Sequence, residues 1–333
     1  MAGFDDIKGQ DSTVTHFKNA IKLNKISHGY IINGEQGMGK KMMADAFSMT
    51  LQCEKKGDNP CMVCHSCRQA LTRNNPDIRW IVHEKPNVIS VEEIRKQINS
   101  DVYIKPYSNE YKIYIVDEAS KMNTAAQNAL LKTLEEPPAY VVILLLTDNK
   151  DMMLQTILSR CVTMELRPVR DNIVENYLIE KAGIADYRAK EICSFAGGNI
   201  GRAVNLAGSD DFLELKENVV KVVKGIGRMT VMDINTAIKE IQEYKDSINE
   251  YIDLLITWYR DVLLYKSCRG YKNIIFYDNI NEIEKQAQLI SFEAIERVLK
   301  ELDGIKGKLK INVNFDVVME LVFMTMRDCF IYG

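Results

Sequence analysis

The chain has 333 residues, of which 46% are hydrophobic and 27% charged, and its formal net charge is −3. This composition is typical of a globular protein with two or three domains, and it excludes a generally basic nucleic-acid binder while leaving room for a local basic face. The first residues are acidic where a secretory signal would be basic, and the longest apolar run, residues 139–146, is too short to cross a bilayer. We therefore expect a cytoplasmic protein with no membrane association.

The first half of the chain alternates short apolar runs with helical stretches, which is the pattern of a parallel sheet flanked by helices. The expected strands are residues 29–33, 78–83, 112–116, 140–147 and 161–166. A helix is expected from about residue 40 to residue 52. The pattern predicts an α/β fold for this half.

The second half of the chain is expected to be helical. Its apolar residues recur with helical periodicity from about Asp211 onward, and a shorter helical segment with a break at Gly197 and Gly198 precedes that region. We predict three domains: an α/β domain over residues 1–168, a small helical lid over 169–208 and a helical domain over 209–333.

A phosphate-loop-like stretch, GEQGMGKK, follows the first expected strand. Gly34, Gly37 and Gly39 let backbone amides turn toward phosphate oxygens, and the Lys40 ammonium neutralises those oxygens. Lys41 stands where the pattern needs a serine or threonine hydroxyl for magnesium, and an ammonium has no lone pair to give a metal. We therefore predict a nucleotide-binding fold in which magnesium ATP binds weakly or unproductively. The alternative is a glycine turn that binds no ligand.

Four cysteines, Cys53, Cys61, Cys64 and Cys67, follow the helix after this loop. In a reducing compartment, cysteines this dense are more often metal ligands than disulfides. Their spacing is compact enough to close one tetrahedral thiolate site, which predicts a structural zinc ion in an insert over about residues 53–67. His65 is an alternative ligand, but it adjoins Cys64, and neighbouring residues converge on one ion only with strain. Such a closed site braces a loop and catalyses nothing.

Polar residues also follow the third and fourth expected strands. Asp117 and Glu118 end the third strand, where in nucleotide motors the first acid holds the magnesium shell and the second polarises the attacking water. Thr147, Asp148 and Asn149 end the fourth strand, at the same edge of a parallel sheet. The alternative for the two acids is a pair of exposed side chains that cap the next helix.

In their order along the chain, these motifs resemble the clamp-loader family of the AAA+ ATPase superfamily. The matching strings are SHGYIINGEQGMGKK, the four-cysteine insert, IYIVDEASKMNTAAQNALLKTLEEPP, LLLTDNKDMMLQTILSRC and GGNIGRA. The resemblance implies a five-stranded AAA+ domain, a lid and a helical collar that joins subunits into a ring. It also implies a polar sensor at Thr147 or Asn149, between which the sequence does not choose, and a lid sensor near Arg202. Gly201 stands where an active motor would have that arginine, which together with Lys41 favours a subunit with little or no ATPase activity.

The resemblance assigns a role in trans to Arg160. In the family, the arginine of the string SRC reaches ATP held by a neighbouring subunit, which suits a guanidinium that stays charged and forks onto phosphate oxygens. The implied partners are motor subunits of the gamma or tau kind and a delta subunit, in a five-membered ring that loads a sliding clamp onto primer-template DNA. Two alternatives remain from the sequence: an active motor subunit of the same family, and a stand-alone zinc-containing DNA-binding protein.

Overall fold

The fold is described from a computed structural model, which describes residues 3–208, 211–242, 244, 247–268, 274–309 and 314–331. These residues fall into two compact units. Unit 1 consists of the described residues up to 183 together with 196–204, and unit 2 consists of 184–195 together with those from 205 onward.

A five-stranded parallel sheet forms the centre of unit 1. The strands are β1 (Gly29–Asn33), β2 (Ile78–Trp80), β3 (Lys112–Val116), β4 (Val141–Thr147) and β5 (Val162–Glu165), and they are arranged in the order β2-β3-β4-β1-β5. The register pairs Asn33 with Thr147, so the loop after β1 begins beside the end of β4. This arrangement confirms the predicted α/β fold with a parallel five-stranded sheet.

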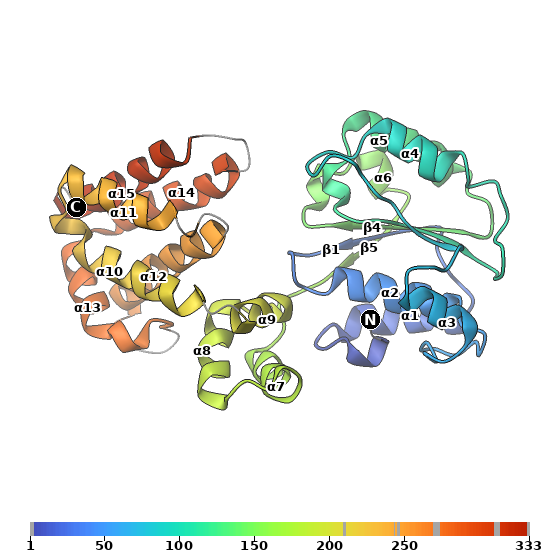
Figure 1. Cartoon of the computed structure of the whole chain (residues 1–333), viewed down its shortest axis with the longest axis horizontal. Helices are drawn as coiled ribbons and strands as arrows, with labels where there is room; N and C mark the ends of the chain where they lie inside the picture. The colour runs from blue at the N-terminus through green and yellow to red at the C-terminus, as the bar shows by residue number, and fades with distance from the viewer. Residues whose placement is uncertain are drawn as a thin grey trace. The chain divides into compact units, whose positions relative to one another are not determined.

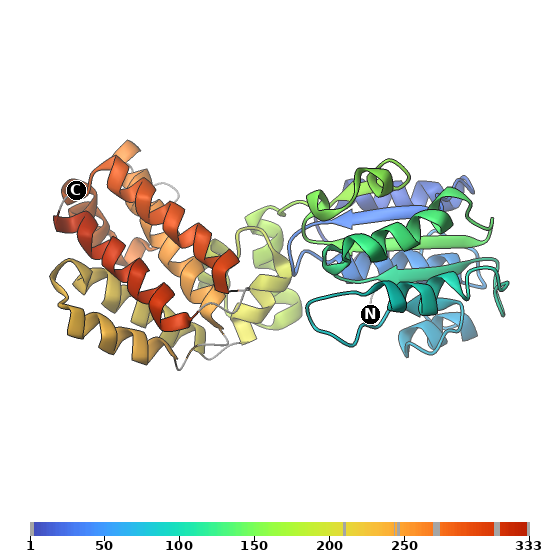
Figure 2. The ribbon, with the colours of Figure 1, turned by 90° about the horizontal axis from the view of Figure 1, so that it is seen from above.

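Helices cover both faces of the sheet (Figures 1 and 2). One face carries α1 (Asp11–Lys22), α2 (Lys40–Leu51) and α3 (His65–Leu71), and the other carries α4 (Val91–Ile94), α5 (Thr124–Glu135) and α6 (Gln155–Leu158). Strand β4 is buried along its whole length because side chains of alternating residues enter the two layers. Val141, Ile143 and Leu145 pack with the α5 layer, whereas Val142, Leu144 and Leu146 pack with the α2 layer.

Strand β2 is shorter than the predicted strand over residues 78–83 and ends at Trp80. Two residues later, the backbone N–H of Val82 donates to the side-chain oxygen of Gln97 at 2.9 Å, and the Gln97 amide donates to the Val82 carbonyl at 2.6 Å. A side chain therefore occupies the backbone groups that a further strand would pair. The prediction of residues 78–83 was therefore too long at this end, although the backbone N–H of Ile81 still donates to the carbonyl of Ile115 in β3 at 2.8 Å.

The rest of unit 1 includes α7 (Asp171–Ala182), and α9 (Ile200–Gly208) begins in it. Unit 2 is helical and contains α8 (Asp186–Ala196), α10 (Asp211–Gly225), α11 (Val231–Gln242), α12 (Ile248–Cys268), α13 (Ile280–Leu289), α14 (Phe292–Leu309) and α15 (Phe315–Ile331). The last two helices pack side by side, as Figure 2 shows. Trp258, Tyr259 and Phe323 are fully buried in this unit.

A helical C-terminal half was predicted and is confirmed. The division into three domains stays a prediction, and its second boundary adjoins residues 209 and 210, which lie outside the described residues. Within the described part of the chain, no helix combines the length and the apolar character needed to cross a membrane.

Candidate functional site

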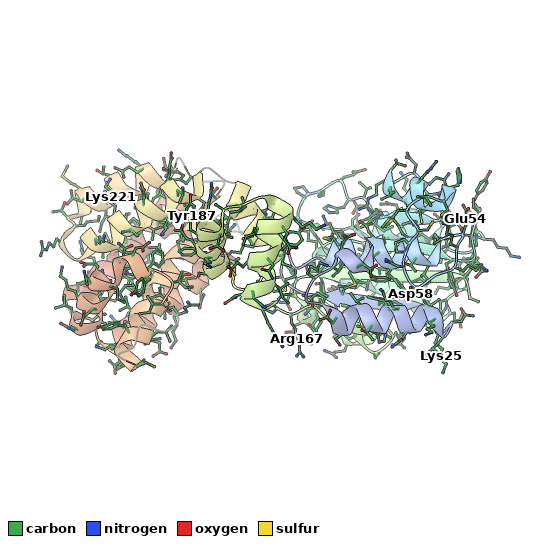
Figure 3. All side chains as sticks on the ribbon, turned by 90° about the horizontal axis from the view of Figure 1, so that it is seen from below. Lys25, Glu54, Asp58, Arg167, Tyr187 and Lys221 are labelled. Atoms are coloured by element: carbon green, nitrogen blue, oxygen red, sulfur yellow. The ribbon has the colours of Figure 1, made fainter. Side chains whose placement is uncertain are left out.

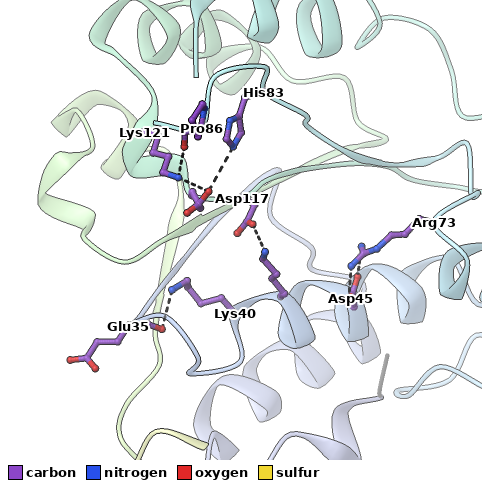
Figure 4. A network of polar contacts seen from close by, with 10 residues as sticks. Glu35, Lys40, Asp45, Arg73, His83, Pro86, Asp117 and Lys121 are labelled. Atoms are coloured by element: carbon purple, nitrogen blue, oxygen red, sulfur yellow. Dashed lines mark hydrogen bonds and ion pairs between the residues drawn. The ribbon is translucent and has the colours of Figure 1, made fainter. Parts of the chain in front are cut away.

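The loop between β1 and α2 has the backbone conformation of a tight glycine turn. Gly37 and Gly39 have positive φ angles of 91° and 94°, which residues other than glycine rarely adopt. The Lys40 ammonium turns back onto this loop and donates hydrogen bonds to the carbonyl oxygens of Gly34 and, at 3.0 Å, Glu35 (Figure 4). Burial lowers the pKa of Lys40, and the carboxylates of Asp148 and Asp117 act in the opposite direction. The loop therefore holds its own lysine.

Lys41 lies on the neighbouring position of helix α2 and forms an ion pair with Asp117 at the end of β3. Its ammonium nitrogen is 2.7 Å from a carboxylate oxygen of Asp117, whose side chain is 20% exposed. Figure 4 shows this contact between the helix and the strand end. Asp117 is the predicted magnesium-shell acid, so a cation of the chain itself occupies the carboxylate that a metal would use.

Glu118, the second predicted acid, is engaged on the other side of the strand end. Its φ angle is 49°, in the left-handed region. Its carboxylate lies 2.7 Å from the Lys121 ammonium and 3.7 Å from the Nε2 atom of His83. Lys121 also donates to the carbonyl of Pro86 at 2.6 Å, which ties this group to the segment after β2 (Figure 4). The two acids therefore have different partners.

The two candidate sensor residues contact each other at the end of β4. Thr147 is fully buried, and its hydroxyl donates to the carbonyl of Asn149 at 3.0 Å and accepts from the Asn149 backbone N–H at 3.2 Å. The Asn149 side-chain oxygen accepts from the backbone of Asp151 at 2.9 Å. Each side chain thus stabilises the turn after the strand, and the geometry does not distinguish between them as a sensor.

The tip of the loop packs directly on the start of helix α9. Gly201 donates its backbone N–H to the carbonyl of Gly37 at 3.0 Å, and the Asn199 amide donates to the carbonyl of Gln36 at 2.8 Å. A Cβ atom added to Gly201 would lie 2.5 Å from the Gly37 oxygen, so no side chain fits there without movement of the loop. Arg202 is one residue further on, and its backbone N–H donates to the Asn199 side chain at 3.0 Å. Asn199 was not identified from the sequence. It could have been recognised because asparagine is favoured immediately before the first residue of a helix.

Arg160 lies at the amino-terminal end of the parallel strands, whereas the loop lies at their carboxyl-terminal end. It precedes β5, whereas the loop follows β1, and these two strands run parallel. Its guanidinium is 2.9 Å from a carboxylate oxygen of Glu135 at the end of α5 and donates to the carbonyl of Thr156 at 2.9 Å. The Arg160 side chain remains 35% exposed. Sequence reasoning also missed Glu135, which no local pattern relates to Arg160.

The four cysteines come together in space. Their sulfur atoms all lie within 4.8 Å of one another. Cys53 and Cys67 are buried, and Cys61 and Cys64 are half-buried. Tetrahedral zinc–thiolate bonds of about 2.3 Å place sulfur atoms roughly 3.8 Å apart, so the cluster needs only a small contraction to hold zinc. His65 is exposed and lies outside the cluster. The donor set therefore fits the predicted four-thiolate site.

Backbone amides point at the cluster from within its own segment. The N–H of Cys64 donates to the Cys61 sulfur and the N–H of Cys67 donates to the Cys64 sulfur, both at 3.4 Å. Hydrogen bonds from the backbone at Val63 and Cys64 lower the pKa of Cys61 to about 6, while burial raises those of Cys53 and Cys67. Glu54 accepts from the backbone of Ser66 at 3.2 Å and is one of the exposed side chains labelled in Figure 3. The backbone N–H groups of Cys64 and Cys67 stabilise the thiolate form of the sulfurs that they contact, and the thiolate is the form that binds metal.

Comparisons with known proteins found similarity to subunits of DNA polymerase III. The family described as DNA polymerase III, delta subunit, matches residues 9–170, which include the loop, the cysteines, both acids and Arg160. Subunit delta' of DNA polymerase III from Bacillus subtilis is 26% identical over 319 residues, covering 93% of this chain and 94% of the relative. Subunit tau from the same organism is 26% identical over 92% of this chain, which spans 58% of that protein. A solved gamma-subunit-related protein from Thermotoga maritima aligns with a TM-score of 0.49 at 18% identity, covering 95% of this chain and 99% of that one.

Proposed function

We propose that the chain is a clamp-loader subunit of DNA polymerase III and that it fills the delta-prime role. In that role it is a structural partner of ATP-hydrolysing subunits and has little or no ATPase activity of its own. The ion pair between Lys41 and Asp117 carries this proposal, because it places an ammonium where a motor subunit needs a hydroxyl and a metal ion.

Two further contacts support the absence of hydrolysis. Glu118 is paired with Lys121 and His83, so a water-polarising role would require it to leave two partners. Gly201 packs on the Gly37 carbonyl, so there is no room for the arginine that a motor subunit would carry at this position. Phosphoryl transfer needs a carboxylate that can polarise water and an arginine in the lid, but here the carboxylate is paired within the chain and the arginine position is a packed glycine.

Arg160 is the residue that we assign to catalysis, in a neighbour's site. An exposed ion pair such as that with Glu135 contributes roughly 0–1 kcal/mol, so a triphosphate can displace the carboxylate at little cost. A guanidinium then forks onto phosphate oxygens and stabilises the charge that develops in transfer. Because the Arg160 side chain is already 35% exposed, it can reach a neighbour without unfolding of the segment.

The cysteine cluster is proposed to hold one structural zinc ion through Cys53, Cys61, Cys64 and Cys67. Four thiolates fill the coordination shell, so the ion supplies folding stability to the insert and no catalytic water. The segment around it contains one helix of about two turns, α3, and the backbone N–H of Cys67 in its first turn donates to the sulfur of Cys64. The metal would thus act as the core of a segment that has little apolar core of its own.

We propose that the chain works in a cytoplasmic ring of five subunits, with motor subunits of the gamma or tau kind and a delta subunit. The ring would bind and open a sliding clamp and release it on primer-template DNA. In this arrangement, the chain contributes Arg160 to one neighbouring ATP site and contributes surfaces to the ring.

The test is ATP turnover of the reconstituted assembly of motor subunits, delta subunit, clamp and DNA. Arg160→Ala is expected to lower the turnover of the whole assembly several-fold. An arginine finger is worth about 10³ or more at the site that it completes, but Arg160 completes only one neighbouring ATP site. The isolated chain is expected to show almost no turnover. A matched control is Arg95→Ala, which removes an exposed arginine elsewhere in unit 1. Equal turnover for the natural chain and Arg160→Ala would contradict the assignment.

A further inference from the structure

A groove of about 750 Å³ runs beside the edge strand β2, within the usual size range of ligand sites. We call it the β2 groove, and its polar lining includes Lys41, Arg73, Asn74, Arg79 and Gln97, with Trp80 as its aromatic residue. Among the described residues that line it, none is acidic. The lining therefore presents cations, amides and apolar surface to a ligand.

The three cations of the groove are held by acids that do not line it. Arg73 makes two hydrogen bonds to Asp45, at 2.7 and 3.0 Å, and Arg79 lies 3.2 Å from Asp101. The Asp45 and Asp101 side chains are each only 10% exposed, whereas those of Arg73 and Arg79 are 39% and 45% exposed. Lys41 is held in the same way by Asp117. The acids fix the direction of the cations, and the cations remain accessible from the groove.

An aromatic platform lies among these cations. The Arg73 guanidinium carbon lies over the Trp80 ring, 3.9 Å from its centre, which is a cation–π contact. The bidentate bond to Asp45 fixes the guanidinium plane in that position. A planar group can therefore stack beside a preformed arginine–tryptophan pair without loss of side-chain freedom.

We propose that the β2 groove binds a short segment of single-stranded nucleic acid. Sequence-tolerant sites of this kind combine a cationic groove for phosphates with stacking surfaces for bases, which are the two features found here. An acidic peptide would satisfy the arginines but would leave the stacking surface without a planar partner. A duplex keeps its bases stacked on each other and cannot offer them to Trp80 and Arg73.

This site goes beyond the proposed function, because that function needs only Arg160 and the ring surfaces. The assignment of Arg160 and the assignment of the β2 groove are tested by independent experiments, so one can be wrong while the other holds. Loss of turnover on Arg160→Ala tests the trans-acting arginine in the assembly, whereas the β2 groove is tested on the full chain alone. No residue of the groove contacts Arg160, which lies at the opposite edge of the sheet.

The experiment measures fluorescence anisotropy of a labelled twelve-nucleotide oligothymidylate titrated with the natural chain, Arg79→Gln and Arg68→Gln. Asp101 keeps its bonds to Lys112 and Tyr114 in Arg79→Gln, so this variant is expected to fold. Arg68 is exposed on α3 outside the groove and is the matched control. We expect Arg79→Gln to weaken binding several-fold and to reduce the slope of log affinity against log salt by about one. Arg68→Gln should bind like the natural chain.

A second measurement needs no variant. Trp80 and Trp258 are the two tryptophans of the chain, and Trp258 is fully buried in unit 2. The oligonucleotide should quench the emission of Trp80, and the quenching should disappear in Trp80→Phe. Absence of binding, equal weakening by both arginine variants, unchanged tryptophan emission, or tighter binding of a duplex would each overturn the proposal. Stronger binding of oligoglutamate with the same dependence on Arg79 would assign the groove to an acidic peptide instead.

Discussion

The Lys41 ammonium lies 2.7 Å from the carboxylate of Asp117, so the chain carries an internal cation at the strand end where a motor subunit binds magnesium. The Lys41 ammonium competes with a metal ion for this carboxylate because both are cations, and it cannot ligate a metal itself because it has no lone pair to offer. The ion pair therefore opposes metal binding at this carboxylate and is the basis of the proposed lack of ATPase activity.

Lys41→Thr is predicted to increase magnesium-dependent nucleotide affinity. The change frees Asp117 and supplies the hydroxyl that the loop pattern requires. Titration of a fluorescent ATP analogue with magnesium, and again with a chelator, should show a several-fold gain that depends on the metal. Lys41→Met is the control, since it removes the charge without supplying an oxygen ligand. Equal affinity of the natural chain and Lys41→Thr in the presence of magnesium would contradict this reading.

Gly201→Ala is predicted to destabilise unit 1, by about 1–3 kcal/mol, which is typical when a methyl group is forced into a packed contact. The added Cβ would lie 2.5 Å from the Gly37 carbonyl oxygen, and the loop would have to move. Gly57→Ala, in the same unit, is the control because the nearest non-neighbouring atom to its added Cβ is 3.5 Å away, an ordinary contact distance. Denaturation by urea, followed by Trp80 emission in a Trp258→Phe background, measures both. Similar midpoints for the two variants would show that the loop adapts freely.

Much of the α/β unit could be predicted from sequence because its information is local. Buried parallel strands appear as apolar runs, and groups at the carboxyl ends of such strands must meet at one edge. The loop, Asp117 and Thr147 were therefore found together, and the cysteine cluster followed from its spacing.

The contacts that were missed join segments far apart in the chain. The pairs Lys41–Asp117 and Arg160–Glu135 depend on how side chains of separate elements are oriented, which no local pattern records. The two hydrogen bonds between Gln97 and the backbone of Val82, just after β2, are another example. Nor does any motif mark the β2 groove, which is assembled from α2, the turn after α3 and the edge strand.

Cys61→Ser is predicted to remove bound zinc and to loosen the insert. The natural chain should carry one zinc ion per chain, and the variant much less, because a serine hydroxyl is not a thiolate ligand. Metal analysis after gel filtration measures the content, and proteolysis measures the loosening near residues 53–67. Cys268→Ser is the control, since Cys268 is exposed and lies in helix α12. Equal zinc content in the natural chain and Cys61→Ser would exclude the four-thiolate site.

Asp101 is predicted to make the stability of unit 1 depend on acid pH. Burial by itself raises the pKa of Asp101, but hydrogen bonds from Lys112 and Tyr114, with the charge of Arg79, more than offset it, so the pKa is lowered. A lowered folded-state pKa contributes stability that is present above the unfolded value of about 3.9 and is lost as pH falls through the folded-state pKa. Urea midpoints followed by Trp80 emission should therefore decline below about pH 4.

Asp101→Asn separates this group from the other acids of the chain. The amide keeps the shape of the carboxyl group but cannot be protonated in this range, so the decline in the urea midpoint below about pH 4 should become shallower. The midpoint at neutral pH should also fall, because Lys112, with a side chain only 4% exposed, loses its counter-charge. Asp58→Asn, at an exposed aspartate labelled in Figure 3, should retain the pH profile of the natural chain. An identical slope in Asp101→Asn and Asp58→Asn would mean that another carboxylate controls the acid transition.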